Sequence, residues 1–262
     1  MQLMDPQTVI ASRGRILYDA SRLRKPDDEL FSVQSWTEMG SVERMAGGRG
    51  SIAILRRDEQ RWVLRHYRRG GMVAKVSQDR YVWRGEARTR SFAEWRLLAR
   101  LRELDLPVPA PIAARYVRAG WTYTADLITE LLPNVETVAR LVAHSSLEPD
   151  RWRKIGRTIA AFHAHGVQHA DLNAHNILLT RPDPDADPPQ TSGLAPPAYL
   201  LDFDRGRIRE RGAWERQVLS RLRRSLEKVS REAHDKPFDE KQWRWLMEGY
   251  EEGERRTADG GR

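Results

Sequence analysis

Three polar residues in the second half of the chain have the types and spacing that phosphoryl transfer needs. Asp171 and Asn176 lie five positions apart in the segment HADLNAHN, and Asp202 follows the apolar residues 199–201. A carboxylate such as Asp171 can accept the proton of an attacking hydroxyl. Asn176 and Asp202 offer the hard oxygen ligands that Mg²⁺ prefers. The sequence therefore predicts a general base and two metal ligands.

The apolar residues beside these positions indicate the elements that hold them. Residues 177–179 (ILL) follow Asn176 and residues 199–201 (YLL) precede Asp202, so we expect two paired strands, each adjoining one ligand. Residues 147–165 repeat apolar side chains with helical spacing and lead directly into the loop. An isolated Asp–Asn pair commonly only caps a turn, but two such strands beside it are rarely accidental.

The first half of the chain contains a candidate phosphate-binding loop. Residues 46–51 read AGGRGS, and the residues 52–55 and 62–64 that follow are predicted to form a hairpin. Glycine allows backbone N–H groups to approach phosphate oxygens closely, although a lone segment of this kind is more often only a turn. The candidate nucleotide contacts here are Gly47, Gly48, Arg49 and Gly50.

A helix and a strand follow this loop. Apolar residues recur with helical spacing over residues 91–104, and Glu94 lies beside that stripe. The sequence PVPAP at 107–111 ends the helix, and residues 121–129 are expected to form a strand. Glu130 then opens a connection to the second half, where backbone groups could meet the edge of an adenine.

Together these segments resemble the protein-kinase-like fold, in its short bacterial lipopolysaccharide-kinase branch. Kinases of that superfamily carry a catalytic loop H-x-D-L-x-x-x-N and a later D-F-G aspartate. The combination of RHYRRGG with HADLNAHNIL is the most specific part of the match. The matching segments cover most of residues 45–210 and are GGRG at 47–50, WVLRHYRRGGMVAK at 62–75, DRYVW at 79–83, FAEWRLLARL at 92–101, HADLNAHN at 169–176 and LLDFDRGRIR at 200–209.

The resemblance implies an α+β, bilobal protein-kinase-like fold, with a strand-rich N-lobe over residues 1–130 and a shortened helical C-lobe over residues 131–262. It implies ATP between the lobes, Mg²⁺ on the two predicted ligands, and Glu94 paired with the cation that meets the ATP phosphates. The implied reaction phosphorylates a hydroxyl of 3-deoxy-D-manno-octulosonic acid (Kdo) on a lipid A precursor, in lipopolysaccharide core assembly. The implied location is peripheral, at the cytoplasmic face of the bacterial inner membrane.

Three features depart from ordinary protein kinases. The strand lysine of V-A-I-K is replaced by Arg65, so either Arg65 or Lys75 must meet the phosphates, and the sequence does not decide between them. D-F-G becomes D-F-D, in which Asp204 is either a further metal ligand or a strand-end cap. No A-P-E segment follows, and too few residues remain for a full peptide-docking lobe. This shortness favours an acceptor that is not a protein.

Charge adds support for an anionic partner. The 262 residues carry a net charge of +8, which attracts polyanions. Residues 205–224 hold a dense run of arginines with apolar residues interleaved, so an amphipathic helix is expected from about Ala213. The resemblance makes this segment a surface for phosphorylated lipid or the anionic inner membrane, although an ordinary solvated face explains it equally well. No nucleic acid partner is expected.

Composition narrows the remaining possibilities. The chain has no cysteine, which leaves no disulfide framework or thiolate metal site. No apolar run approaches the roughly 18 residues that span a membrane, and no secretion signal is expected at the N-terminus. The histidines crowded into residues 163–175 fit the helix end and the catalytic loop better than a zinc site. Residues 181–198, rich in proline, are expected to form a flexible loop, and residues 250–262 a frayed tail.

Two other functions remain open from the sequence. Another small-molecule kinase of the aminoglycoside or choline type, or an atypical Ser/Thr kinase, would share the catalytic loop but would not be expected to carry RHYRRGG. An inactive kinase-like module could bind nucleic acid or membrane through its arginines. The intact catalytic loop argues against that module, while the missing strand lysine argues for it.

Overall fold

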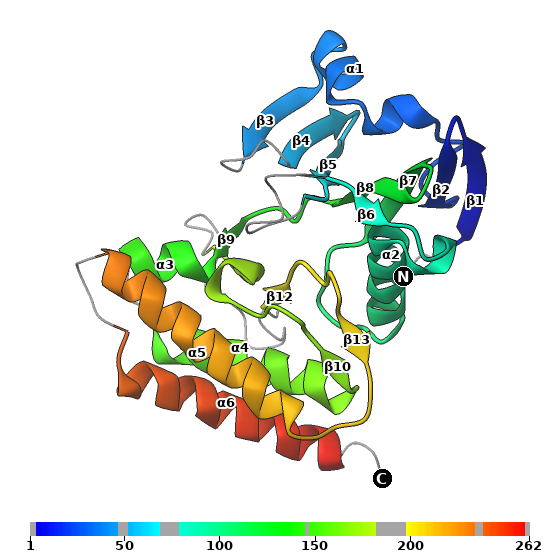
Figure 1. Cartoon of the computed structure of the whole chain (residues 1–262). Coiled ribbons are helices and arrows are strands. Elements are labelled where there is room, and N and C mark those ends of the chain that lie inside the picture. Colours follow the sequence, from blue (N-terminus) through cyan, green and yellow to red (C-terminus); the bar gives the residue numbers. More distant parts are fainter. Residues whose placement is uncertain are drawn as a thin grey trace. The chain divides into compact units, whose positions relative to one another are not determined.

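The computed structural model describes residues 4–46, 52–68, 79–144, 147–181, 198–233 and 238–259. Its contacts divide the chain into two compact units. Unit 1 comprises Met1–Glu103 and Pro109–Leu131, and unit 2 comprises Leu104–Val108 and Leu132–Arg262. Unit 1 is built mainly of strands and unit 2 mainly of helices (Figure 1).

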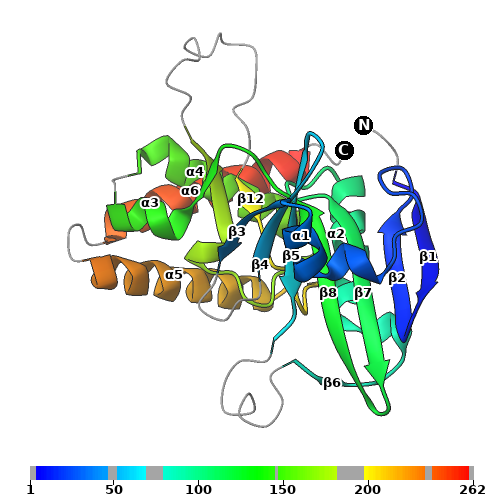
Figure 2. The same ribbon diagram turned by 90° about the horizontal axis from the view of Figure 1, so that it is seen from above.

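Unit 1 is an antiparallel sheet with the strand order β1-β2-β7-β8-β5-β4-β3, in which β6 pairs with β8 (Figure 2). The strands are β1 (Pro6–Ala11), β2 (Gly14–Asp19), β3 (Val42–Ala46), β4 (Ile52–Arg57), β5 (Gln60–His66), β6 (Tyr81–Val82), β7 (Pro111–Ala119) and β8 (Thr122–Glu130). Short helical segments lie between them: η1 (Asp28–Phe31), α1 (Val33–Glu38) and η3 (Glu86–Arg88).

The predicted hairpin of unit 1 is confirmed by β4 and β5. Arg57 pairs with Gln60 across a two-residue turn, and Asp58 takes the positive φ of 53° that the turn requires. β3 and β4 also pair, with Ala46 opposite Ile52. The glycine-rich residues between these two strands lie outside the described residues, so their predicted contacts are not placed.

The helix predicted over residues 91–104 is α2 (Arg90–Glu103), which packs against β7. Its apolar stripe is buried, and Phe92 and Trp95 are at most 1% exposed. Such burial stabilises a helix more than its intrinsic propensity does. The same burial carries Glu94 into the interior, where only 3% of the residue is exposed.

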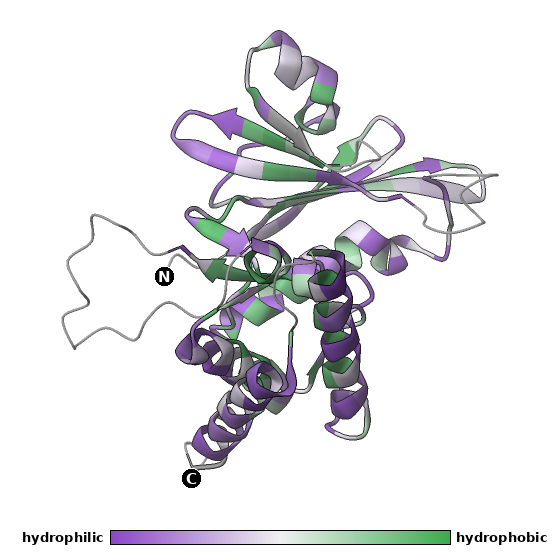
Figure 3. Cartoon of the chain, turned by 90° about the vertical axis from the view of Figure 1, so that its left-hand side faces the viewer, coloured by the Kyte–Doolittle hydropathy of each residue, from purple (hydrophilic) through white to green (hydrophobic). Residues whose placement is uncertain are grey.

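Unit 2 is built around helices and short strands. The helices are α3 (Val138–His144), α4 (Pro149–Ala164), α5 (Trp214–Ala233), α6 (Glu240–Asp259) and the 3₁₀ turn η4 (Ala174–Asn176). The strands are β9 (Val135–Thr137), β10 (Val167–Gln168), β11 (Ile177–Thr180), β12 (Tyr199–Leu200) and β13 (Arg207–Ile208), arranged as sheets β12-β11-β9 and β10-β13. Hydrophilic and hydrophobic residues alternate along the helices, as amphipathic packing requires (Figure 3).

The frayed tail predicted for residues 250–262 is wrong over the described part, because α6 continues to Asp259. Glycine there serves close helix packing. A Cβ on Gly249 would lie 2.1 Å from the carbonyl oxygen of Arg153 in α4, and one on Gly156 would lie 2.0 Å from the carbonyl oxygen of Leu246 in α6. The polar residues of α6 also pair across the contact, as in Arg153 with Glu248 (2.9 Å).

We expect Gly249→Ala to lower the free energy of unfolding by about 1–3 kcal/mol, the usual cost of overpacking a core. Helix propensity alone would favour alanine by about 1 kcal/mol, so the two arguments predict opposite signs. Urea unfolding decides between them. Gly212→Ala is the control, since nothing lies within 4 Å of its Cβ position. A stabilised Gly249→Ala protein would refute the close contact.

Candidate active site

The loop between β10 and β11 holds the predicted base and one predicted metal ligand. Asn176 Nδ2 and Asn173 Nδ2 both donate hydrogen bonds to the backbone carbonyl of Asp171, each at 3.0 Å. Asn173 also caps η4 by accepting from the backbone N–H of His175 (2.9 Å). Because the amide nitrogen of Asn176 serves as a donor, its carbonyl oxygen is the atom left to bind a cation.

Asp202 is tied to the same loop through its neighbour Leu201. The Leu201 N–H donates to the carbonyl of Asn176 (2.9 Å), and the Leu201 carbonyl accepts from Nε2 of His169 (2.8 Å). The predicted strand pair is confirmed by β11 and β12. The structure thus brings Asp171, Asn176 and Asp202 together on one loop and hairpin of unit 2, and their catalytic roles stay predictions.

His169 is buried and joins this loop to the segment before Asp202 through two hydrogen bonds. Its Nδ1 accepts from the backbone N–H of Asp171 (3.1 Å), so the proton lies on Nε2, which donates to Leu201. Burial lowers the pKa of His169, so the ring stays neutral at neutral pH and keeps this tautomer. The ring also contacts Phe203, which stacks on Phe162 of α4. The packing links α4, the loop and the D-F-D segment.

The backbone turns sharply at Asp202. Its φ of 60° is in the left-handed region, which aspartate tolerates better than most residues with a Cβ. A tight turn follows, in which the Gly206 N–H donates to the Phe203 carbonyl (2.7 Å). Asp204 lies within this turn, and both of its predicted roles stay open. Strained residues of this kind concentrate at functional sites.

One residue beside the predicted base was missed by the sequence reasoning. Arg221 of α5 places Nη1 at 2.9 Å from Oδ1 of Asp171. Both side chains are largely exposed, at 50% and 62%, so the pair adds little to stability. Arg221 stands in an arginine-rich helix, and nothing in the sequence distinguishes it from its neighbours.

In unit 1, the structure pairs Arg65 of β5 with Glu94 of α2. Arg65 Nη2 and the hydroxyl of Tyr67 both donate to Oε2 of Glu94 at 2.5 Å. The Glu94 side chain is only 2% exposed, so its charge depends on these donors. The guanidinium also lies over the Tyr67 ring, 4.7 Å from its centroid. Burial, followed by the Glu94 charge, raises the pKa of Tyr67 well above its usual value, which keeps the hydroxyl protonated as a donor.

The other predicted nucleotide contacts are less defined. Lys75 and the glycine-rich residues 47–50 lie outside the described residues. Glu130 ends β8, where its N–H donates to the Ala110 carbonyl (2.9 Å) and its carboxylate meets Arg22 (3.3 Å). Since the backbone N–H of Glu130 is already bonded, any contact of Glu130 with an adenine would have to use its carbonyl.

Within the described residues, no group of three or more histidine, cysteine, aspartate or glutamate side chains is placed to hold a metal ion. His163 is instead a core residue that is 1% exposed, and its Nδ1 lies 2.8 Å from the hydroxyl oxygen of Tyr250 in α6. His165 Nδ1 bonds to the Ala161 carbonyl at the end of α4 (2.9 Å). These two contacts belong to helix packing and helix termination.

Because of His163, the free energy of unfolding should depend on pH. Burial lowers the pKa of His163 from 6.5 to about 4, so the unfolded chain binds the proton first as pH falls. Stability contributed by the neutral ring is present above pH 6.5 and is lost between pH 6.5 and about 4, at up to about 1.4 kcal/mol per pH unit. Urea unfolding of the wild type and His163→Gln across that range measures it. We expect a shallower slope in the variant, and equal slopes would contradict the assignment.

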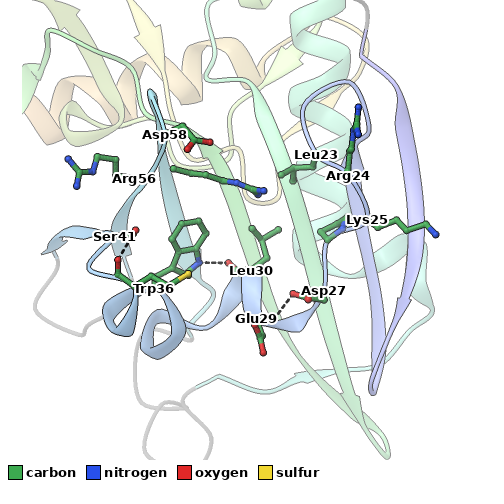
Figure 4. Close-up of a pocket in the computed structure, with 13 residues that line it drawn as sticks. Leu23, Arg24, Lys25, Asp27, Glu29, Leu30, Trp36, Ser41, Arg56 and Asp58 are labelled. Atoms are coloured by element: carbon green, nitrogen blue, oxygen red, sulfur yellow. Dashed lines mark hydrogen bonds between the residues drawn. The ribbon is translucent and has the colours of Figure 1, made fainter.

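Two of the cavities among the described residues have volumes above 500 Å³. One of about 580 Å³ lies in unit 1, where charges of both signs, such as Arg56 and Asp58, surround Trp36 (Figure 4). None of the predicted site residues lines it. The other, of about 510 Å³, lies in unit 2 between residues 168–170 of the catalytic segment and one face of α5, and Arg221 is among its lining residues.

Comparison with known proteins agrees with this geometry. The model of the lipopolysaccharide kinase (Kdo/WaaP) family matches residues 33–250. The 3-deoxy-D-manno-octulosonic acid kinase of Stenotrophomonas maltophilia (strain R551-3) is 46% identical over 220 residues, which cover 82% of this chain and 81% of that protein. The kinase of the same name from Xanthomonas axonopodis pv. citri (strain 306) is 45% identical over 230 residues, or 86% of each chain.

A solved structure of WaaP in complex with acyl carrier protein has the same fold. The two chains are 16% identical and align with a TM-score of 0.50, over 81% of this chain and 78% of that chain. The α+β, protein-kinase-like fold predicted from the sequence is therefore confirmed. The family match spans most of the chain, and the predicted family is confirmed as well: this chain belongs to the lipopolysaccharide kinase (Kdo/WaaP) family.

Proposed function

We propose that this protein transfers the γ-phosphoryl group of ATP to a hydroxyl of Kdo, in assembly of the lipopolysaccharide core. The observation that carries the proposal is the hydrogen-bonded set of Asp171, Asn176 and the residue before Asp202, in a chain 46% identical to a Kdo kinase. Use of ATP follows from the kinase family. This reading is favoured over an inactive module because Asp171, Asn176 and Asp202 are all present and hydrogen bonds join Asp171, Asn176 and Leu201.

The residues have separate roles in this proposal. Asp171 accepts the proton of the acceptor hydroxyl as the oxygen attacks the phosphorus. Asn176 and Asp202 fit Mg²⁺, because they present an amide oxygen and a carboxylate from backbone segments bonded to each other. When bound, the ion neutralises charge on the phosphates. Arg65, oriented by Glu94, is the cation that binds the ATP phosphates as a fork.

The acceptor is a Kdo residue carried on a lipid A precursor. No helix among the described residues is long and apolar enough to cross a membrane. Access to such a lipid acceptor therefore requires peripheral contact with the cytoplasmic face of the inner membrane, and the positive net charge of the chain supports attraction to that anionic surface.

The test is transfer of labelled phosphate from ATP, with magnesium, to a Kdo-bearing lipid A precursor. The same precursor without Kdo is the matched control, and an aminoglycoside and choline are offered in parallel. We expect labelling only of the Kdo-bearing acceptor. Labelling of aminoglycoside or choline instead would replace the proposed acceptor, and absence of ATP binding by calorimetry would support the inactive module.

A further inference from the structure

The cavity beside the predicted base is lined with arginines. The polar side chains that line it are Gln168, His169, Arg216, Gln217, Ser220, Arg221 and Arg224. The pocket is therefore formed by one stripe of α5 and by the residues that lead into the catalytic loop. No carboxylate is among its lining residues. We refer to it as the arginine pocket.

The arginines of α5 and of the segment before it differ in how their charge is balanced. Arg211 binds Glu215 and Glu254, and Arg223 binds Glu227 and Glu240. These neutralised arginines do not line the pocket.

The arginines of the pocket have no glutamate partner among the described residues. Arg216 and Arg224 form no hydrogen bond or ion pair with the described part of the chain, and Arg221 binds only Asp171 within it. Like charges gathered without glutamate partners repel one another, and an anion bound among them would relieve that repulsion. The arginine pocket therefore has the charge of a site for an anion.

Arg221 fixes where that anion lies relative to the chemistry. One of its Nη atoms is 2.9 Å from Asp171, and a guanidinium has further N–H donors in the same plane. A second carboxylate bound to those donors would lie beside the predicted base. The acceptor is a sugar acid, whose carboxylate is within one sugar of every hydroxyl it carries. A phosphate elsewhere on a lipid acceptor would be farther away.

We propose that the arginine pocket binds the carboxylate of the acceptor sugar acid and thereby presents its hydroxyl to Asp171. The inference rests on the proposed function and deepens it, since it explains why an acidic sugar is chosen over a neutral one. Arg216 and Arg224 supply positive charge, and Arg221 sets the position of the carboxylate relative to Asp171. Hydrogen bonds to the rest of the sugar come from Gln168, Gln217 and Ser220. The pocket is a specificity site, and the proton transfer stays with Asp171.

The test compares two acceptors that differ only at the carboxyl group: the Kdo-bearing precursor and its Kdo methyl ester. We expect wild type to have a KM about 10- to 100-fold lower for the acid, the usual worth of charge-assisted hydrogen bonds. Arg216→Gln combined with Arg224→Gln should raise the KM for the acid by a similar factor and leave that for the ester nearly unchanged. Arg231→Gln, on α5 but outside the pocket, is the control for lost charge.

Three results would overturn the inference. The first is a double variant that is impaired equally on acid and ester. The second is a loss that disappears when the phosphates of the lipid are removed, which would assign the arginines to lipid phosphate. The third is a loss of binding to vesicles containing phosphatidylglycerol with the acid preference intact, which would assign them to the membrane surface.

A binding measurement separates this inference from the proposed function. Free Kdo and its methyl ester are titrated calorimetrically into wild type and the double variant, without ATP. If wild type binds the acid but not the ester, and the double variant loses this selectivity, the pocket is a carboxylate site even if no transfer to Kdo is found. Transfer to Kdo with no such selectivity upholds the function and rejects the pocket.

Discussion

Asp171→Asn should lower kcat for phosphate transfer by about 10²- to 10⁴-fold, the usual scale for loss of a general base. The substitution keeps the shape of the side chain and removes its ability to accept a proton. The loop should stay folded, because the backbone carbonyl of residue 171 accepts the 3.0 Å bonds from Asn173 and Asn176, while the bond from Asn173 to the Asp171 carboxylate is long, at 3.5 Å. The exposed carboxylate contributes little to stability, so the unfolding midpoint should be unchanged.

The control for this variant is Asp150→Asn. Asp150 is also an exposed aspartate paired with an arginine, Arg153 at 3.0 Å, but it lies at the start of α4. It should retain wild-type turnover. Both variants are assayed for transfer and for ATP binding. Near-normal turnover of a folded Asp171→Asn protein would remove Asp171 from the role of base.

Arg65→Met should damage both stability and activity. It removes the Arg65 guanidinium from the buried Glu94 carboxylate, and breaking a buried ion pair costs about 3–5 kcal/mol. Since the Arg65 side chain is 21% exposed, we expect the lower end of that range in urea unfolding. Loss of a phosphate-binding cation should lower kcat/KM for ATP by about 10²- to 10³-fold.

A second substitution separates these two effects. Arg65→Met combined with Glu94→Gln removes the uncompensated charge and keeps a side chain that can accept from Tyr67. Stability should recover for the most part, while kcat/KM stays low because no cation meets the phosphates. Full recovery of activity in the double variant would show that Arg65 acts only on the fold, and would assign the phosphates to Lys75 or another group.

The catalytic loop could be predicted from the sequence because the interactions that form it join residues close together in the chain. The hydrogen bonds that bring Asn176 to Asp171 span five residues, and the flanking apolar strands are visible as short runs. The amphipathic helices α2 and α4 could be predicted for the same reason, since their spacing repeats within one element. Sequence alone also supplied Glu94, although its partner remained undecided between Arg65 and Lys75.

The contacts that were missed join residues far apart in the chain. Arg221 meets a residue fifty positions away, and Tyr67 meets Glu94 across a strand and a helix. Neither contact has a local pattern. The end of α6 was misjudged because residues 250–262 are polar and contain glycine, which lowers helix propensity, while the close packing of Gly253 against Ala160 of α4 depends on a partner helix that the local sequence does not reveal.

The close packing of α4 against α6 at their glycines should limit which truncations of the gene leave a functional protein. α4 leads through β10 directly into the catalytic loop, and the face of α4 at Gly156 is shaped to fit α6. A premature stop codon at residue 240 would remove none of the predicted catalytic residues, yet it would remove the helix that packs against α4, the helix that leads into them. The last helix should therefore be as intolerant of nonsense mutations as the catalytic loop itself.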